Sequence, residues 1–523
     1  MAAVKQIFSA LGWLLLLAFF TLIVLVPLAA LAKTSLVTGA IIPNKVLAPL
    51  ATSVMFALTT SVLSALAGAC AGTAVRFTGK VYGSCLDVLA LAAIVFPPFI
   101  HCEAYQSVCE HLLPRYAIWG NATATFLAGA AYVSAYLPIS YFAMRIALAK
   151  IDPNAVASMR VLGVSEAKIY FLSAAGPAAQ VLPATVLFGF VLTISDPLVP
   201  ALIRLPFPSA AYATWLSTTS ATHIGEGATL ALAIALVTLC GAGATAFYYR
   251  RWGLDLLRQN LLSTALASRP LREAHLRPAP VYTLAMLAIA AFLGICPLTL
   301  AAKVSLPTMT SLEPVATTIA LAVISVAISL TIVAVAFLLT WQSRSLRWAD
   351  YLFFFLAATP GATLGTAFSL AYLLDTPVQI LGTSDWLATI LSYCGVISPL
   401  CYFFLRAFAA SLDHNAISLT QILGISKGRA ILLASQPLLQ LLLASAATIS
   451  VAIAAVGTAP LMWVISPDVN LVVPLLFKLL DHAQTQQAST LTLFVGAIIL
   501  ASAGIANYLV RSRLRRRSRW RQV

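Results

Sequence analysis

Charged side chains are scarce in this sequence of 523 residues. Asp, Glu, Lys and Arg make up 9% of it, against 61% hydrophobic residues, which is too little charge to cover the surface of a water-soluble globular protein. The mean hydropathy is +0.95. The composition therefore excludes a soluble domain and predicts an all-α integral membrane protein, because lipid offers no partner for unpaired backbone groups.

Ionisable residues are rarer still inside the long apolar runs. A charge within the bilayer is costly and commonly marks ion or proton coupling, so this absence counts against a proton-coupled carrier. Asp196, in TISDPLVPALIR, is the nearest exception, at the outer end of an expected span. Two interpretations stay open for it. Asp196 lines a solute pathway or contacts a partner, or it caps the backbone at Pro197 and its neighbours.

Catalytic and nucleotide-binding signatures are also missing. The segment GTAVRFTGK at 72–80 has the wrong spacing for a phosphate-binding loop, and Val81 stands where such a loop needs Ser or Thr. We therefore expect that the chain is not an enzyme and that it binds no cofactor or metal. If transport uses ATP, another chain must supply the ATPase.

The eight cysteines show neither a disulfide framework nor zinc-ligand spacing. The polar segment HCEAYQSVCEH, 101–111, expected between the third and fourth spans, leaves three alternatives: a metal site, a disulfide between Cys102 and Cys109, or a merely polar loop. The other cysteines are expected to be small buried apolar residues. These are Cys70, Cys85, Cys240, Cys296, Cys394 and Cys401.

Apolar runs of about 20 residues dominate what is present, and each is long enough to cross a bilayer. The first, from Leu11 to Ala32, is too long for a signal peptide and is expected to be a retained span. We expect twelve spans, six in each half, on either side of an Arg- and Pro-rich linker at 251–280. The expected domains are 1–250, the linker, 281–510 and a basic tail at 511–523. The spans are expected near 11–32, 50–75, 85–108, 122–148, 170–200, 225–249, 281–303, 314–341, 348–374, 385–409, 430–463 and 486–510.

The formal net charge is +15, and the Lys and Arg residues sit in short clusters between the expected spans. In the twelve-span arrangement, all but six of the 31 Lys and Arg residues fall on one side, which the positive-inside rule assigns to the cytoplasm. We therefore expect a multi-pass protein with both termini cytoplasmic, and no nucleic-acid binding. The seven arginines from Arg511 to Arg521 are expected to anchor the tail near anionic lipid.

An internal repeat relates the two halves. Asp87 precedes the third expected span as Asp350 precedes the ninth, 263 residues later, and Pro97 corresponds to Pro360 at the same offset. Two halves with an even number of spans have the same orientation, which predicts a parallel pseudo-two-fold arrangement with a pathway at the interface.

The most informative part of the repeat is a short polar helix-turn-helix between two spans. In 413–437, DHNAISLTQILGISKGRAILLASQP, Asp413 can cap a helix, Gly424 can end it in the left-handed conformation and Ser426 can cap the next. In the first copy, Gly163 and Ser165 occupy the equivalent positions. Two such loops predict paired docking surfaces for a two-fold partner.

These loops resemble the Glu-Ala-Ala loops of permease subunits in bacterial binding-protein-dependent ABC importers. Gly424 and Pro437 keep the family's Gly-to-Pro spacing, and Gly163 to Pro177 is one residue longer. Arg160 keeps the frequent basic residue after the motif, and Gln421 replaces it in the second copy. The motif positions are Ala157, Ser158 and Met159 in the first loop and Ser418, Leu419 and Thr420 in the second, so both lack the acid.

The whole organisation resembles the fused two-domain permeases of the ferric-iron type, a group similar to thiamine, polyamine and phosphonate permeases. The resemblance implies that 153–168 and 414–429 are coupling helices for a dimer of cytoplasmic ATPase subunits, which use ATP. It also implies an outer face that docks a solute-binding protein and a location in the bacterial inner membrane. Ferric iron is the first substrate to expect. A self-sufficient secondary transporter with two six-span repeats is the alternative.

Overall fold

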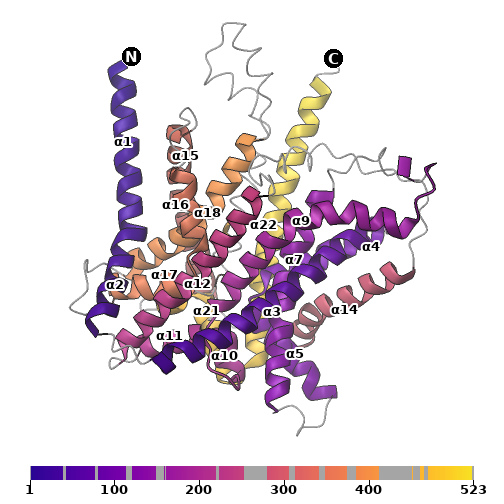
Figure 1. The fold of residues 1–523 in the computed structure, drawn as a ribbon, viewed down its shortest axis with the longest axis horizontal. Helices are drawn as coiled ribbons and strands as arrows, with labels where there is room; N and C mark the ends of the chain where they lie inside the picture. The colour runs from indigo at the N-terminus through magenta and orange to yellow at the C-terminus, as the bar shows by residue number, and fades with distance from the viewer. Residues whose placement is uncertain are drawn as a thin grey trace.

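The chain is described by a computed structural model. It covers residues 2–38, 43–76, 80–112, 120–148, 158–159, 161–219, 223–251, 280–304, 312–340, 348–373, 385–410, 450–451, 457, 460–464 and 469–520. The fold of these residues is all-helical (Figure 1). Both termini lie at the same end of the bundle, called here the terminal end (Figure 1).

The helices up to Arg251 form the first part of the bundle. They are α1 (Ala2–Phe20), η1 (Thr21–Leu25), α2 (Val26–Thr38), α3 (Pro43–Arg76), α4 (Lys80–Val95), α5 (Pro98–Leu112), α7 (Asn121–Leu148), α9 (Glu166–Ile194), α10 (Leu198–Ile203), α11 (Ala210–Thr219) and α12 (Ile224–Arg251).

The helices from Pro280 onward form the second part. They are α14 (Pro280–Ala302), α15 (Leu312–Thr340), α16 (Trp348–Ala358), α17 (Gly361–Phe368), η3 (Ser369–Leu373), α18 (Asp385–Ala410), η4 (Pro460–Trp463), α21 (Val472–Asp481) and α22 (Thr485–Trp520). The last helix continues through most of the expected basic tail.

The number of membrane spans agrees in part with the sequence. Among the described residues, nine helices are long and apolar enough to cross a bilayer, and two bent helix pairs raise the number to eleven if each pair is one span. The chain is thus a multi-pass membrane protein. The expected linker at 251–280 and most of the expected span at 430–463 lie outside the described residues.

Two of the expected spans, at 85–108 and 348–374, are bent helix pairs. The α4–α5 pair turns by 110° at Pro97 and Pro98, and the α16–α17 pair turns by 94° at Pro360. Proline lacks the amide hydrogen that a helix needs and disfavours helical backbone in the residue before it. The expected span at 170–200 is also interrupted, because α9 ends at Ile194 and the short α10 follows.

The first helix of each part packs against the other part of the chain. α1 contacts α15 and η1 contacts α18, whereas α14 contacts α3, α4 and α5. One hydrophobic core accordingly joins Leu16 and Ile23 to Phe353 and Tyr372. Separating the two parts would expose this core.

Helices α3 and α7 approach closely through small residues. A Cβ atom on Gly68 would lie 2.4 Å from the carbonyl oxygen of Leu137 and 2.8 Å from the backbone nitrogen of Tyr141. Ser140 Oγ donates to Ala65 O at 2.7 Å in the same contact. Such small-residue contacts let helices pack through van der Waals contact where lipid offers no hydrophobic driving force.

The cysteine predictions are wrong at three positions. Cys70, Cys85 and Cys240 are exposed on the bundle, whereas Cys296, Cys394 and Cys401 are buried. An apolar side chain on a membrane span can face lipid as well as the interior. Apolarity alone therefore does not identify the core.

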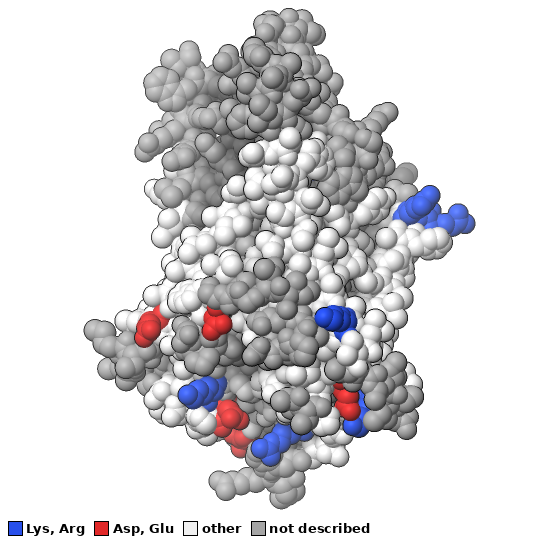
Figure 2. All heavy atoms as spheres, turned by 90° about the vertical axis from the view of Figure 1, so that its left-hand side faces the viewer, with Lys and Arg blue, Asp and Glu red and all other residues white. Residues whose placement is uncertain are grey.

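Charges are unevenly distributed on the surface. On the face shown in Figure 2, Asp, Glu, Lys and Arg side chains lie mostly toward one end and leave a broad band of uncharged side chains. At the end opposite the termini, Lys45 on α3 pairs with Glu226 on α12 at 2.8 Å, and Lys303 pairs with Glu103 on α5 at 3.2 Å.

Candidate functional site

The connection between α7 and α9 carries the first copy of the predicted docking motif. Leu162 N donates to Ser158 O at 3.0 Å, and Val164 N donates to Met159 O at 3.0 Å across Gly163. Gly163 has φ 73°, in the left-handed region. This is the hydrogen-bond pattern by which glycine ends a helix, so the prediction of left-handed backbone at Gly163 is confirmed.

Ser165 lies at the predicted position but without the predicted contact. It is the N-cap residue of α9, with φ −60° and ψ 144°, and its side chain makes no capping hydrogen bond. Its carbonyl oxygen accepts from Ile169 N at 3.0 Å. Ser158 is exposed in the turn before Gly163.

Large apolar side chains of this segment are exposed outside any candidate span, since the span within α9 begins only at Ala174. Val161 is 87% exposed and Leu162 79%, both beside Gly163. Phe171 is 72% exposed and Leu172 50%, in the first turns of α9. Apolar surface beyond the lipid-covered part of a chain is typical of a protein-protein contact.

The other predicted docking residues cannot be placed. Both loops extend over residues that lie outside the described part of the chain, including most of the second copy. These residues are Ala157, Arg160, Ser418, Gln421, Gly424 and Ser426.

Asp196 occupies the break between α9 and α10. Its Oδ1 accepts from Leu198 N at 2.9 Å, which confirms the capping contact. The residue is only 2% exposed, so it is buried in the protein and does not lie at a surface. Oδ2 is buried and has no hydrogen-bond partner among the described residues. The phenols of Tyr132 and Tyr136 interact electrostatically with this carboxylate.

We expect Asp196→Ala to lower the free energy of unfolding by about 0.5–2 kcal/mol, because the Leu198 amide loses its cap. Asp196→Asn keeps an acceptor at the same place and is expected to remain within a few tenths of a kcal/mol of the wild type. Denaturation of both variants in the same detergent measures the difference. Equal stability of the two variants would contradict the capping role.

The segment that follows the break at Asp196 shares a hydrophobic core with η4, from the other part of the chain. Leu198 and Val199 lie in one hydrophobic core with Met462 and Trp463 of η4. Trp215 Nε1 on α11 donates to Met462 O at 3.2 Å. Interrupted spans are where transporters place irregular backbone next to a pathway.

Gly365 permits the close approach of α17 to η4. A Cβ atom there would lie 2.8 Å from Trp463 Cε3 and 2.9 Å from Pro460 O. The indole nitrogen of Trp463 is buried without a hydrogen-bond partner in the described part of the chain. The contact between α17 and η4 thus combines close packing with a buried polar group that has no partner among the described residues.

The segment 101–111 is part of helix α5, which corrects the expectation of a polar loop. Cys102 is buried, and both Cys102 and Cys109 are free, so the disulfide alternative is wrong. His101 is fully buried, with Nε2 3.0 Å from Ala93 O and Nδ1 2.9 Å from Ser134 Oγ. Among the residues that the structure covers, no group of three His, Cys, Asp or Glu side chains could hold a metal ion.

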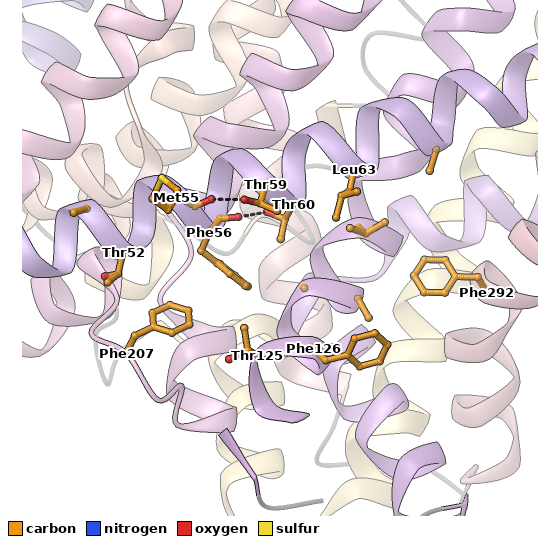
Figure 3. A pocket seen from close by; sticks show the side chains of 15 residues that line it. Thr52, Met55, Phe56, Thr59, Thr60, Leu63, Thr125, Phe126, Phe207 and Phe292 are labelled. Atoms are coloured by element: carbon orange, nitrogen blue, oxygen red, sulfur yellow. Dashed lines mark hydrogen bonds between the residues drawn. The ribbon is translucent and has the colours of Figure 1, made fainter. Parts of the chain in front are cut away.

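An open groove of about 870 Å³ lies on α3 and α7, with Phe207 and Phe292 at its edge (Figure 3). Its threonine hydroxyls are bonded to backbone carbonyls: Thr59 donates to Met55 O at 2.7 Å and Thr60 to Phe56 O at 2.9 Å (Figure 3), and Thr52 donates to Pro208 O at 2.7 Å. The groove therefore presents methyl and ring surfaces on the outside of the spans. It offers no ligand chemistry for a polar solute.

The comparisons with known proteins identify no relative. No family model, no curated protein and no solved structure matches this chain. The function is therefore inferred from the geometry of the chain itself.

A three-residue polar cluster joins α4 to α7. Asp87 Oδ1 accepts from Tyr141 OH at 2.7 Å and from Arg145 Nη1. The Arg145 guanidinium carbon lies 5.8 Å from the centre of the Tyr141 ring. About a third of each charged side chain is exposed, 32% for Asp87 and 38% for Arg145.

The same cluster joins α16 to α18. Asp350 Oδ1 accepts from Tyr402 OH at 2.6 Å, and Oδ2 accepts from Arg406 Nη2. The Tyr402 ring stacks on Phe353 with centroids 4.1 Å apart. Sequence reasoning identified the two aspartates but missed their partners, although YFAMR at 141–145 and YFFLR at 402–406 recur 261 residues apart.

Proposed function

We propose that this chain is the permease subunit of an ABC importer, which forms a solute pathway and is coupled to a separate ATPase through two loops. The loop at 158–165 carries the proposal. Its backbone is fixed by left-handed Gly163, and it exposes Val161 and Leu162 outside the spans. A rigid apolar loop of this kind suits a groove in a partner protein.

The proposed architecture is two parallel six-span pseudo-repeats. The repeated Asp–Tyr–Arg contacts, the two bent pairs at Pro97 and Pro360, and the reciprocal packing of the first helices all support it. The pathway is proposed to run beside Asp196 and Trp463, where the break between α9 and α10 lies next to η4.

The proposed location is the bacterial inner membrane, with both termini and both loops in the cytoplasm. Both termini lie at one end of the bundle (Figure 1), and α7 and α18 run toward that end. The opposite face would receive a solute-binding protein, and ferric iron is the first substrate to test.

Purification in mild detergent with co-expressed genomic neighbours, followed by mass spectrometry, tests the proposal. We expect an ATPase at two copies per permease. Purification without any ATPase, together with solute transport in liposomes that lack ATP, would contradict it and would identify a secondary transporter.

A further inference from the structure

The two Asp–Tyr–Arg clusters occupy matching places relative to the loops. Arg145 lies in the last turn of α7, directly before the first loop, and Arg406 lies near the end of α18, before the second. Their aspartates lie on different helices, α4 and α16. Each cluster is thus a link between a loop-bearing helix and a neighbour that is not part of the loop.

The neighbouring helices lead to the hydrophobic core that α5 and α10 share with η4. Asp87 is eight residues before the end of α4, about 12 Å along the axis, and the 110° bend at Pro97 follows. Asp350 is eight residues before the end of α16, which leads to the 94° bend at Pro360. Beyond the bends, α5 packs on α10, and α17 packs on η4.

The chemistry of the clusters suits a link that transmits movement. A charge-assisted hydrogen bond is stronger and more directional than a neutral one, and each aspartate also accepts from a tyrosine on the same helix as its arginine. An apolar contact between two helices can slide, whereas two convergent hydrogen bonds fix both the height and the rotation of one helix against the other.

We propose that the Asp87–Tyr141–Arg145 and Asp350–Tyr402–Arg406 clusters are positioning residues that transmit displacement of the cytoplasmic loops to the bends at Pro97 and Pro360. This proposal rests on the proposed function. When a loop moves with its ATPase, the arginine of the cluster moves too and displaces the aspartate to which it is bonded. The helix that holds this aspartate, α4 or α16, then moves as a rigid body. The bend at its end, next to the proposed pathway, changes position as a result. The same link carries the signal in reverse, from the outer face to the ATPase.

The test is the stimulation of ATP hydrolysis by the solute-binding protein encoded beside this chain, measured on the permease–ATPase complex in proteoliposomes. For Asp87→Asn combined with Asp350→Asn, we expect the ATPase to copurify and basal hydrolysis to persist, while stimulation falls at least fivefold relative to the wild type. Asparagine keeps the size of the side chain and removes its charge.

Ser140→Ala is the matched control. It removes the buried hydrogen bond from Ser140 Oγ to Ala65 O, which joins the same helix α7 to α3 rather than to a helix that leads to a bend. We expect wild-type stimulation in this variant. An equal loss in the control, or full stimulation in the double asparagine variant, would overturn the proposal.

Tyr141→Phe combined with Tyr402→Phe keeps the test decisive if the asparagine variant does not fold. These substitutions remove only the hydroxyl donors and leave the ion pairs and ring contacts in place, so we expect a stable protein with stimulation reduced at least twofold. Unchanged stimulation in a folded phenylalanine variant would also overturn the proposal. If no ATPase copurifies with the wild type, the proposed function itself fails. This result is distinct from a failure of the cluster proposal, in which the ATPase copurifies but stimulation does not change.

Discussion

Replacing Gly163 and Gly424 by valine together abolishes ATP-driven uptake and leaves the protein inserted in the membrane. Gly163 has φ 73°, and a β-branched residue in that conformation costs on the order of 1–3 kcal/mol. The loop would relieve this cost by changing its shape, and with it the surface that we propose to fit the ATPase. A Cβ atom added to Gly163 would have no neighbour within 4 Å among the described residues, so valine there disturbs no packing in the bundle. We expect uptake to fall at least 100-fold.

Uptake by whole cells, with membrane quantity of the permease measured by immunoblot, checks this expectation. Gly176→Ala is the control, because Gly176 lies within α9 and an added Cβ there also has no described neighbour within 4 Å. Alanine favours a helix at this position, so uptake should be unchanged. Normal uptake in the double valine variant would show that the loops are not docking elements.

Val161→Asp combined with Leu162→Asp should remove the ATPase from the purified complex. Burying an exposed aliphatic side chain of this size contributes about 1.5–3 kcal/mol each, and a carboxylate in the same contact must lose its hydration. Losing both contacts reduces affinity at least 100-fold, since 1.4 kcal/mol corresponds to a factor of ten. The measurement is the ratio of ATPase to permease after purification in mild detergent.

Leu216→Asp combined with Val304→Asp is the matched control. These two apolar residues are 55% and 56% exposed and, like Val161 and Leu162, lie outside every candidate span. We expect the ATPase to remain bound to this variant. Loss of the ATPase from both variants would mean that added charge, rather than the loop contact, weakens the complex.

The sequence predicted best those features that depend on backbone chemistry. Long apolar runs predicted the helices, and the requirement for left-handed backbone predicted the conformation of Gly163. The matching prolines at Pro97 and Pro360 were recognised as a repeat, but the size of the bends there, 110° and 94°, was not predicted. A proline kink within a helix and a complete turn look the same in a linear sequence, and the neighbouring helices decide between them.

Side-chain partners could not be predicted, for a physical reason. Asp87 meets Tyr141 and Arg145 only because α4 and α7 lie side by side, which hydropathy does not show. Burial within the membrane was also poorly predicted, because lipid-facing and core-facing positions are equally apolar. Cys70 and Cys296 illustrate this, since one is exposed and the other buried.

Because α1 and η1 pack against helices of the second part, their native contacts form late during synthesis. Leu22 O accepts from Tyr372 OH, a partner that follows it by 350 residues. At about 5–20 residues per second, a ribosome needs roughly 20–70 s to reach that tyrosine. The α1 helix likewise has to wait for α15, which begins about 300 residues after it. Both α1 and η1 are therefore synthesised long before the helices of the second part that they contact.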